Sequence, residues 1–447
     1  MGGHLSEGEL GVLVPRRARL GACNGRQLAA GTCADQMFRM AAMQSCAGAA
    51  ALARLRARPD READATLRSL RSPTACTSTS LWTLAGGLSQ AGYATHAVVS
   101  NPYLALQYGL GAGFDTYENV SLESEALVAL RGTLGGHLAA RFLGDRLVDS
   151  GGRVSDRGIH CLRRAAADWR RCERPFLLWL HYIDPHAPYG CGGDKSFRGD
   201  TLLSGIRHDG GLGDRFEAIA RLRAGEIRLT AEEKTQLIAL YDAGVASVDQ
   251  QVGRVLDELA ALQLDDDVLV AVVSDHGEEF WEYGGVEHGH TFYDELVRVP
   301  LLFAGPGIPR DQRVPSLVSL ADLPPTIAQL VGAEAPQGLD GVPIPLLGDA
   351  PAGTRAVRCE ALLFAEDKLA VRTEQLKYVR WSSGKEELYD LSSDPLEQRD
   401  IADIAATVDL TWARNLTTER ARRATQAGDA PVDTAYLQAA MERLGYA

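Results

Sequence analysis

The chain has 447 residues, of which 45% are hydrophobic and 23% are charged, and its formal net charge is −13. A chain of this length is too long for one small core and suggests two to three domains. The composition is ordinary for a globular protein. The negative charge argues against a nucleic-acid partner, because non-specific nucleic-acid binding needs a basic face.

Residues 1–80 differ from everything that follows and show no clear strand. They contain 11 arginines against 6 acidic residues, with many Ala, Gly and Cys residues. The segment is either a flexible arginine-rich extension or an out-of-frame translation of GC-rich DNA. We favour the second interpretation, because the start of a real domain should show apolar periodicity.

The sequence has no apolar run of 18 residues, so no membrane span is predicted. The first 30 residues also lack the apolar region of a signal peptide. As written, the chain is expected to be cytoplasmic. A periplasmic or secreted protein is the alternative if the true N-terminus carries a signal peptide.

Alternating helices and strands are predicted from Leu81 onward. The expected helices are 84–91, 124–149, 159–171 and 230–262, and the expected strands are 95–100, 176–182 and 268–273. In the helix 230–262, Thr230 and Glu233 form a capping box ahead of a long apolar stripe.

The strand 268–273 ends at Ser274 and is followed directly by Asp275 and His276. In α/β folds ligands gather outside the carboxyl ends of parallel strands. A carboxylate beside a neutral imidazole supplies half of the ligand shell of a divalent cation, since oxygen favours harder cations and nitrogen favours Zn²⁺ or Mn²⁺. The competing interpretation is a capping aspartate followed by histidines on a solvated loop.

Two further histidine sites accompany this pair. His288 and His290 follow within fifteen residues, ahead of an apolar run at 299–304. Earlier in the chain, His186 lies between two prolines in the segment DPHAPY, directly after the strand 176–182. Because the prolines restrict the backbone on both sides, His186 is held on a stiff loop, as a general acid or an anion-contacting imidazole requires. An ordinary turn histidine is the alternative.

The C-terminal third predicts a different architecture. Residues 314–330 suggest a strand, a turn and a helix, with two prolines near the helix start. Residues 361–390 suggest short strands separated by turns, as in a small antiparallel sheet, and the last 45 residues suggest charged helices. We therefore divide the chain into an aberrant or disordered segment 1–80, an incomplete α/β domain 81–350, and a C-terminal antiparallel sheet with a helical tail, 351–447.

Eight segments between residues 81 and 402 resemble the sulfatase family of the alkaline-phosphatase-like superfamily, and they occur in the order of that family. They are TLAGGLSQAGYATHAVVSNPYL, GFDTYENV, PFLLWLHYIDPHAPY, LIALYDAGVASVDQQVGRVLDEL, VVSDHGEEFWE, HGHTFYDELVRVPLL, VSLADLPPTIAQLVG and ELYDLSSDPLEQRDI.

The resemblance implies an α/β fold with a mixed, mostly parallel central sheet flanked by helices and a small C-terminal antiparallel subdomain. It also implies one divalent cation, Ca²⁺ in the first place, with Mn²⁺ or Zn²⁺ as alternatives. Asp275 and His276 match the metal-binding pair of the family. His186 matches the histidine that contacts the sulfuryl group or the leaving oxygen. His288 and His290 flank the place where many members carry a lysine.

One departure from the family affects the predicted activity. Sulfatases begin with a strand that ends in two metal-binding aspartates, followed by Cys or Ser in a C/S-x-P-x-R motif. This chain has neither feature; Leu13-Val14-Pro15-Arg16-Arg17 has the spacing without the nucleophile. We therefore expect a family hydrolase for small-molecule or sugar sulfate esters that is inactive as written. The alternatives are a non-catalytic sulfatase-like binding protein and a phosphate or phosphonate ester hydrolase of the same superfamily. The sequence does not indicate an oligomeric state.

Overall fold

A computed structural model of the chain describes residues 10–15, 30–31, 82–101, 104, 106, 109–120, 150–187, 189, 221–346, 355–360, 368–403, 410–411 and 413–415. The expected helix 124–149 and nearly all of the expected C-terminal helices lie outside these residues. The predicted domain boundaries at 80 and 350 also lie outside them.

A six-stranded sheet forms the centre of the molecule, with the strand order β10-β6-β1-β5-β3-β4. Its strands are β1 (Leu10–Pro15), β3 (Ala94–Val99), β4 (Thr116–Asn119), β5 (Phe176–His181), β6 (Val268–Val273) and β10 (Leu301–Ala304). Strand β3 pairs in parallel with β4 and β5, and both β5 and β6 run antiparallel to β1. Strands β3, β4, β5 and β6 therefore share one direction, so the predicted mixed, mostly parallel sheet is confirmed.

Strand β1 lies between β5 and β6 in the sheet, although the sequence analysis found no clear strand in residues 1–80. Leu10 is paired with His181 and Val273, and Pro15 is paired with Val268. The hexapeptide LGVLVP is apolar and rich in valine and leucine, a composition typical of central strands in α/β sheets. A second short strand from this part of the chain, β2 (Ala30–Gly31), pairs with β9 (Arg298–Val299).

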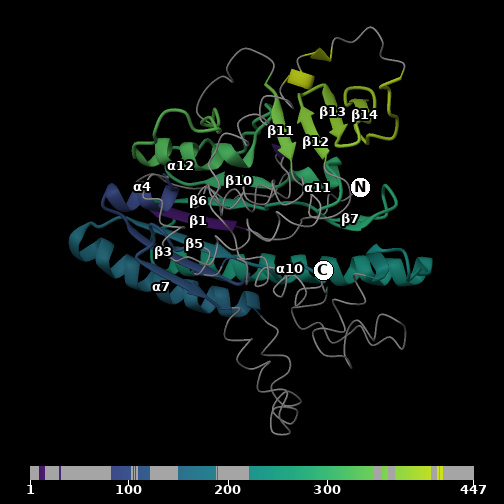
Figure 1. Ribbon diagram of the computed structural model, residues 1–447. Coiled ribbons are helices and arrows are strands. Elements are labelled where there is room, and N and C mark those ends of the chain that lie inside the picture. Colours follow the sequence, from purple (N-terminus) through teal and green to yellow (C-terminus); the bar gives the residue numbers. More distant parts are fainter. Residues whose placement is uncertain are drawn as a thin grey trace, which may run out of the picture.

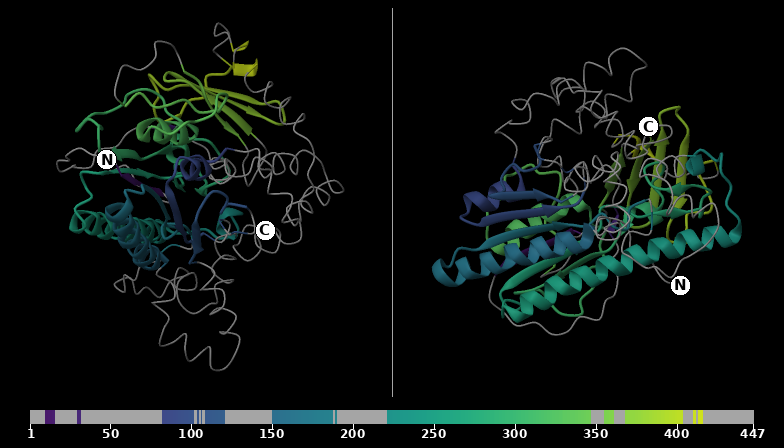
Figure 2. Two further views of the ribbon diagram at one scale, coloured as in Figure 1. Left: turned by 90° about the vertical axis from the view of Figure 1, so that its left-hand side faces the viewer. Right: turned by 90° about the horizontal axis from the view of Figure 1, so that it is seen from below.

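Helices cover both faces of the sheet (Figure 1). On one face lie α7 (Ser150–Cys172) and α10 (Ala231–Ala261), which run side by side in the view from below (Figure 2). On the other face lie α4 (Leu84–Gln90) and α12 (Leu323–Val331). Each pair packs against its own apolar cluster, so the core consists of two layers separated by the sheet.

The start of α7 depends on a residue from the loop that carries His186. Asp184 accepts hydrogen bonds from Ser150 Oγ at 2.9 Å and from the backbone N of Gly151 at 2.9 Å. A Cβ atom at Gly151 would come within 3.0–3.1 Å of this carboxylate, so glycine permits the close approach. The sequence predicted only 159–171 as helix, because the group that caps the first turn lies 34 residues away in the chain.

Around α12, one sequence prediction was wrong. Residues 314–319 form no strand; instead Ser319 caps a 3₁₀ turn, η6 (Leu320–Asp322), through a capping box with Asp322. The apolar residues Leu317 and Val318 are buried without joining the sheet. The helix α12 then begins with prolines in its first turn, as predicted, and ends at Gly332 in the left-handed conformation.

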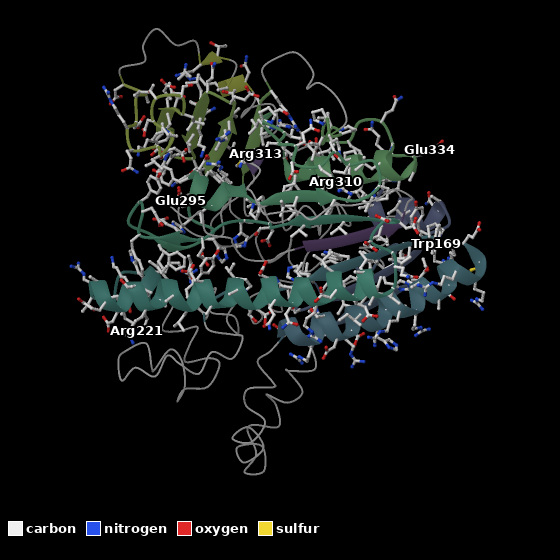
Figure 3. All side chains as sticks on the ribbon, turned by 180° about the vertical axis from the view of Figure 1, so that it is seen from behind. Trp169, Arg221, Glu295, Arg310, Arg313 and Glu334 are labelled. Atoms are coloured by element: carbon white, nitrogen blue, oxygen red, sulfur yellow. The ribbon has the colours of Figure 1, made fainter. Side chains whose placement is uncertain are left out.

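A four-stranded antiparallel sheet forms the C-terminal part, as expected. Its strands are β11 (Val357–Glu360), β12 (Lys368–Arg372), β13 (Leu376–Trp381) and β14 (Glu386–Asp390). The sequence analysis missed β11. Figure 3 shows Glu295 beneath this sheet, on α11 (Asp294–Val297). Within the described part of the chain, no helix has the length and apolar character needed to cross a bilayer.

A buried ion cluster ties α11 to this sheet. The Nζ atom of Lys377, on β13, lies 2.7 Å from Asp294 Oδ1 and 2.5 Å from Glu397 Oε1, and it donates to the backbone O of Phe292 at 2.9 Å. Arg372 adds a second cation at 3.0 Å from Asp294 Oδ2. The two parts are therefore joined by charged groups removed from water.

Candidate active site

Asp275 and His276 lie buried at the carboxyl end of β6. The backbone N of His276 donates to Asp275 Oδ1 at 2.9 Å, and Ser274 Oγ donates to the backbone O of His276 at 2.9 Å. The backbone N of Gly277 donates to Leu296 O at 2.7 Å, and a Cβ at position 277 would collide with the backbone of Glu295. The Asp-His-Gly segment is therefore fixed against α11 by its own backbone.

His186 is held on its loop at the carboxyl end of β5. The backbone N of His186 donates to Ile183 O at 2.9 Å, and its Nδ1 lies 2.5 Å from the backbone O of Ala187. The neighbouring Asp184 is bound to the first turn of α7. The loop is thus fixed at both the histidine and the aspartate by hydrogen bonds.

His288 brings these two segments together. Its ring stacks on that of His276, with centroids 4.1 Å apart and planes inclined by 29°. The ring of His186 meets His288 edge to face, with centroids 5.2 Å apart. Three imidazoles predicted from separate motifs therefore form one contiguous group beside Asp275.

In all three histidines the Nδ1 atom faces an oxygen. The partners are Ala187 O for His186, Gly277 O at 2.9 Å for His276, and Glu278 Oε1 at 3.0 Å for His288. A carbonyl or carboxylate oxygen can only accept, so in each ring Nδ1 donates and Nε2 carries the lone pair. Such contacts orient histidine ligands and raise the basicity of the other nitrogen.

Burial governs the protonation of these groups. It lowers the pKa of His186 and His276, and it lowers the pKa of His288 well below the usual value. Burial also raises the pKa of Asp275 well above its usual value. The imidazoles are therefore neutral, the form that binds metal ions, and Asp275 is a buried carboxyl that a nearby cation would hold ionised.

The pair Asp275 and His276 has the donor chemistry of part of a cation site. His276 Nε2 lies 3.9 Å from Asp275 Oδ2, a separation that one cation about 2.0–2.6 Å from each atom can bridge. Among the described residues, no group of three or more His, Cys, Asp or Glu side chains is arranged to hold a metal ion. The pair thus has the donors of half of a ligand shell, and its role as a metal site stays a prediction.

His290 has a different environment from the other three predicted histidines. Its Nε2 lies 2.6 Å from Glu279 Oε2, and its backbone O accepts from Lys368 Nζ at 3.4 Å. Its Nδ1 is buried without a hydrogen-bond partner among the described residues. No ring contact links it to the group formed by His186, His276 and His288, so its role in the site stays a prediction.

Two residues of this region were not given a role by the sequence analysis. His181, the last residue of β5, is 1% exposed, and neither ring nitrogen has a partner in the described part of the chain. Burial lowers its pKa to about 3. Glu287 has a φ of 68°, and burial raises its pKa to about 8. The position of His181 at a strand end was the available signal; for Glu287 the sequence offered none.

Comparisons with known proteins identify the family of the chain. A model of the sulfatase family matches residues 69–333. Arylsulfatase K of Rattus norvegicus is 28% identical over 287 residues, which is 58% of this chain and 50% of the relative. The chain therefore spans about half the length of this curated relative.

Two solved structures share the fold. One, a complex with its substrate D-glucosamine-2-N,6-O-disulfate, has a TM-score of 0.53 at 19% identity, covering 79% of this chain and 84% of the other. The phosphonate monoester hydrolase of Agrobacterium radiobacter has a TM-score of 0.55 at 20% identity, covering 80% and 82%. At these identities the likeness concerns the fold alone.

Proposed function

Because the chain belongs to the sulfatase family, we propose that its site binds the sulfate ester of a small molecule or a sugar. The observation that carries this proposal is the junction of His186, His276 and His288 at the carboxyl ends of β5 and β6. The sugar-sulfate complex among the structural neighbours supports the substrate class.

In this proposal Asp275 and His276 hold one divalent cation, Ca²⁺ in the first place. When bound, the cation supplies positive charge for the non-bridging oxygens of the ester. Asp275 offers a carboxylate oxygen and His276 offers its Nε2 lone pair. Mn²⁺ and Zn²⁺ are the alternatives, because imidazole nitrogen also suits these ions.

His186 contacts the sulfuryl group or the leaving oxygen, and its stiff loop keeps the imidazole in place. His288 lies between His186 and His276, and His290 is held nearby by Glu279. The chain as written contains no C/S-x-P-x-R sequence, so it lacks the family nucleophile. We therefore expect binding of sulfate esters without turnover.

The test uses the full chain with Ca²⁺ present. We expect no hydrolysis of p-nitrophenyl sulfate above the buffer rate, together with binding of D-glucosamine 6-sulfate in saturation-transfer NMR. His186→Ala should abolish the binding signal, because it removes the imidazole that faces the sulfate. The matched control is His160→Ala, since His160 is exposed on α7.

Each other outcome would contradict part of the proposal. Turnover of the aryl sulfate would refute the expected inactivity. Equal binding of unsulfated glucosamine would refute a sulfate site and favour a non-catalytic binding protein of another specificity. Turnover of a phosphonate monoester instead would favour the phosphate or phosphonate ester hydrolase.

A further inference from the structure

Glu278 is buried directly behind the three site histidines and binds two of the predicted segments at once. It is 6% exposed. Its Oε1 lies 3.0 Å from His288 Nδ1, and its Oε2 accepts a hydrogen bond from the Tyr189 hydroxyl at 2.9 Å. Tyr189 ends the DPHAPY segment, and His288 belongs to the second histidine cluster. One carboxylate therefore joins the two loops that converge on the site.

The three histidines differ in what fixes their Nδ1 atoms. His186 and His276 use backbone carbonyls of the residue that follows each of them. His288 uses the side chain of Glu278, ten residues away. The Nδ1 contact of His288 is therefore made to a side chain, whereas those of the other two histidines are made to the local backbone.

The neighbouring pair Glu279 and His290 provides an internal contrast. There the carboxylate faces Nε2, at 2.6 Å, instead of Nδ1. Because a carboxylate only accepts, His290 carries its proton on Nε2, while His288 carries its proton on Nδ1. The two adjacent glutamates therefore bind different ring nitrogens: Glu278 binds Nδ1 of His288, and Glu279 binds Nε2 of His290.

We propose that Glu278, itself anchored by Tyr189, is a positioning residue that fixes the ring orientation and the Nδ1–H tautomer of His288. In this arrangement the nitrogen of His288 without a proton is Nε2, on the ring that contacts those of His186 and His276. The ring stack with His276 then holds the imidazole beside Asp275. The inference relies on the proposed function only for the identity of the ligand, a sulfate ester.

The first test reads the tautomer directly, without any ligand. Two-dimensional ¹H–¹⁵N NMR of the histidine ring nitrogens at pH 8 should show His288 as the Nδ1–H form and His290 with its proton on Nε2. His288→Gln and His290→Gln assign the two signals. Glu278→Leu should remove the Nδ1–H pattern of His288, while Glu278→Gln should keep it, since the amide oxygen can still accept.

Two further variants keep the test decisive if Glu278→Leu does not fold. Tyr189→Phe should broaden or shift the His288 signal, because Glu278 loses its second partner. Glu279→Gln, the matched control, should change the His290 signal and leave that of His288 in place. An unchanged His288 tautomer in folded Glu278→Leu, an unchanged His288 signal in Tyr189→Phe, or a native Nε2–H form of His288 would overturn the proposal.

The second test measures the affinity for D-glucosamine 6-sulfate with Ca²⁺. Loss of the group that orients a metal-ligating histidine costs about 10- to 100-fold in metal affinity or activity, and we take this range for the orientation of His288. We expect that loss in Glu278→Leu and near-native affinity in Glu278→Gln. Equal affinity in both variants would contradict a positioning role. If the native chain binds no sulfate ester at all, the proposed function fails, whereas the tautomer measurement still decides the role of Glu278.

Discussion

The rings of His276 and His288 stack with centroids 4.1 Å apart, although the two residues come from different loops. The contact places an imidazole from the second histidine cluster against the residue that follows Asp275. Burial excludes water from both rings and keeps them neutral. The site is therefore a buried, nitrogen-rich surface with the carboxyls of Asp275 and Glu278 beside it.

Replacement of the Asp275 carboxyl should weaken cation binding. Asp275→Asn removes the negative charge while keeping the shape of the side chain, so we expect the Ca²⁺ affinity measured by calorimetry to fall at least about 10-fold. Asp265→Asn is the control, because the exposed Asp265 lies at the other end of β6. Equal affinity in the two variants would exclude Asp275 as a ligand.

Replacement of Lys377 should destabilise the fold. Lys377→Met leaves the carboxylates of Asp294 and Glu397 facing each other without their shared cation. The breaking of a buried ion pair costs about 3–5 kcal/mol, and urea unfolding measures this loss. Lys385→Met is the control; its partner Glu387 lies at 2.7 Å, but the lysine side chain is 56% exposed. A similar small effect of both variants would contradict a stabilising role for the cluster.

The pH dependence of stability should reflect Glu287. The pKa of this carboxyl is raised from 4.5 to about 8; burial is the main cause, Glu278 adds to the rise, and Arg223, at 3.4 Å, opposes it. The folded state thus retains a proton that the unfolded chain loses above pH 4.5. Consequently the free energy of unfolding falls as the pH rises from about 4.5 to 8.

The variant Glu287→Gln should remove this dependence. We expect it to be more stable than the native chain at pH 8.5, by on the order of 3 kcal/mol, and little changed at pH 4.5. Thermal unfolding at both pH values provides the measurement. Glu334→Gln, at an exposed position labelled in Figure 3, is the control. A variant that loses stability at pH 8.5 would show that Glu287 is ionised in the fold.

Removal of the Asp184 carboxylate should loosen the start of α7. Asp184→Ala leaves Ser150 Oγ and the N–H of Gly151 without their acceptor, and the loss of such a cap costs about 1–2 kcal/mol. Because Asp184 and His186 share one loop, hydrogen exchange of the loop amides should also become faster. Asp257→Ala, at an exposed position of α10, is the control. Unchanged hydrogen exchange of the loop amides in Asp184→Ala would show that the order of the loop does not depend on the cap of α7.

The features of the fold and the site that depend on residues close in the sequence could be predicted. The strand β6 and the Asp-His pair at its end depend on neighbours within a few residues, and so does the capping box of α10. His186 was recognisable because its two prolines constrain the backbone directly. The family resemblance then supplied the order of the elements and the mostly parallel sheet.

Features that depend on partners distant in the sequence could not be predicted. The first turn of α7 is capped by Asp184, and Glu278 gains its importance only because Tyr189 and His288 converge on it. Likewise, Leu317 and Val318 have a strand-like pattern but are buried beside the sheet, where Ser319 starts a 3₁₀ turn. In each case a tertiary contact outweighs the local pattern.

Strand β1 runs antiparallel to β5 and β6, and this direction determines where the segment with the spacing of the C/S-x-P-x-R motif lies. In this spacing, with Pro15 and Arg17, Leu13 occupies the position of the family nucleophile. In the sheet, Leu13 pairs with Val270 and Leu178. Those partners lie three residues inside the sheet, about 10 Å from the ends of β5 and β6. The backbone at position 13 is therefore displaced from the strand ends where Asp275 and His186 lie, so a cysteine introduced there with the right spacing would not restore a sulfatase.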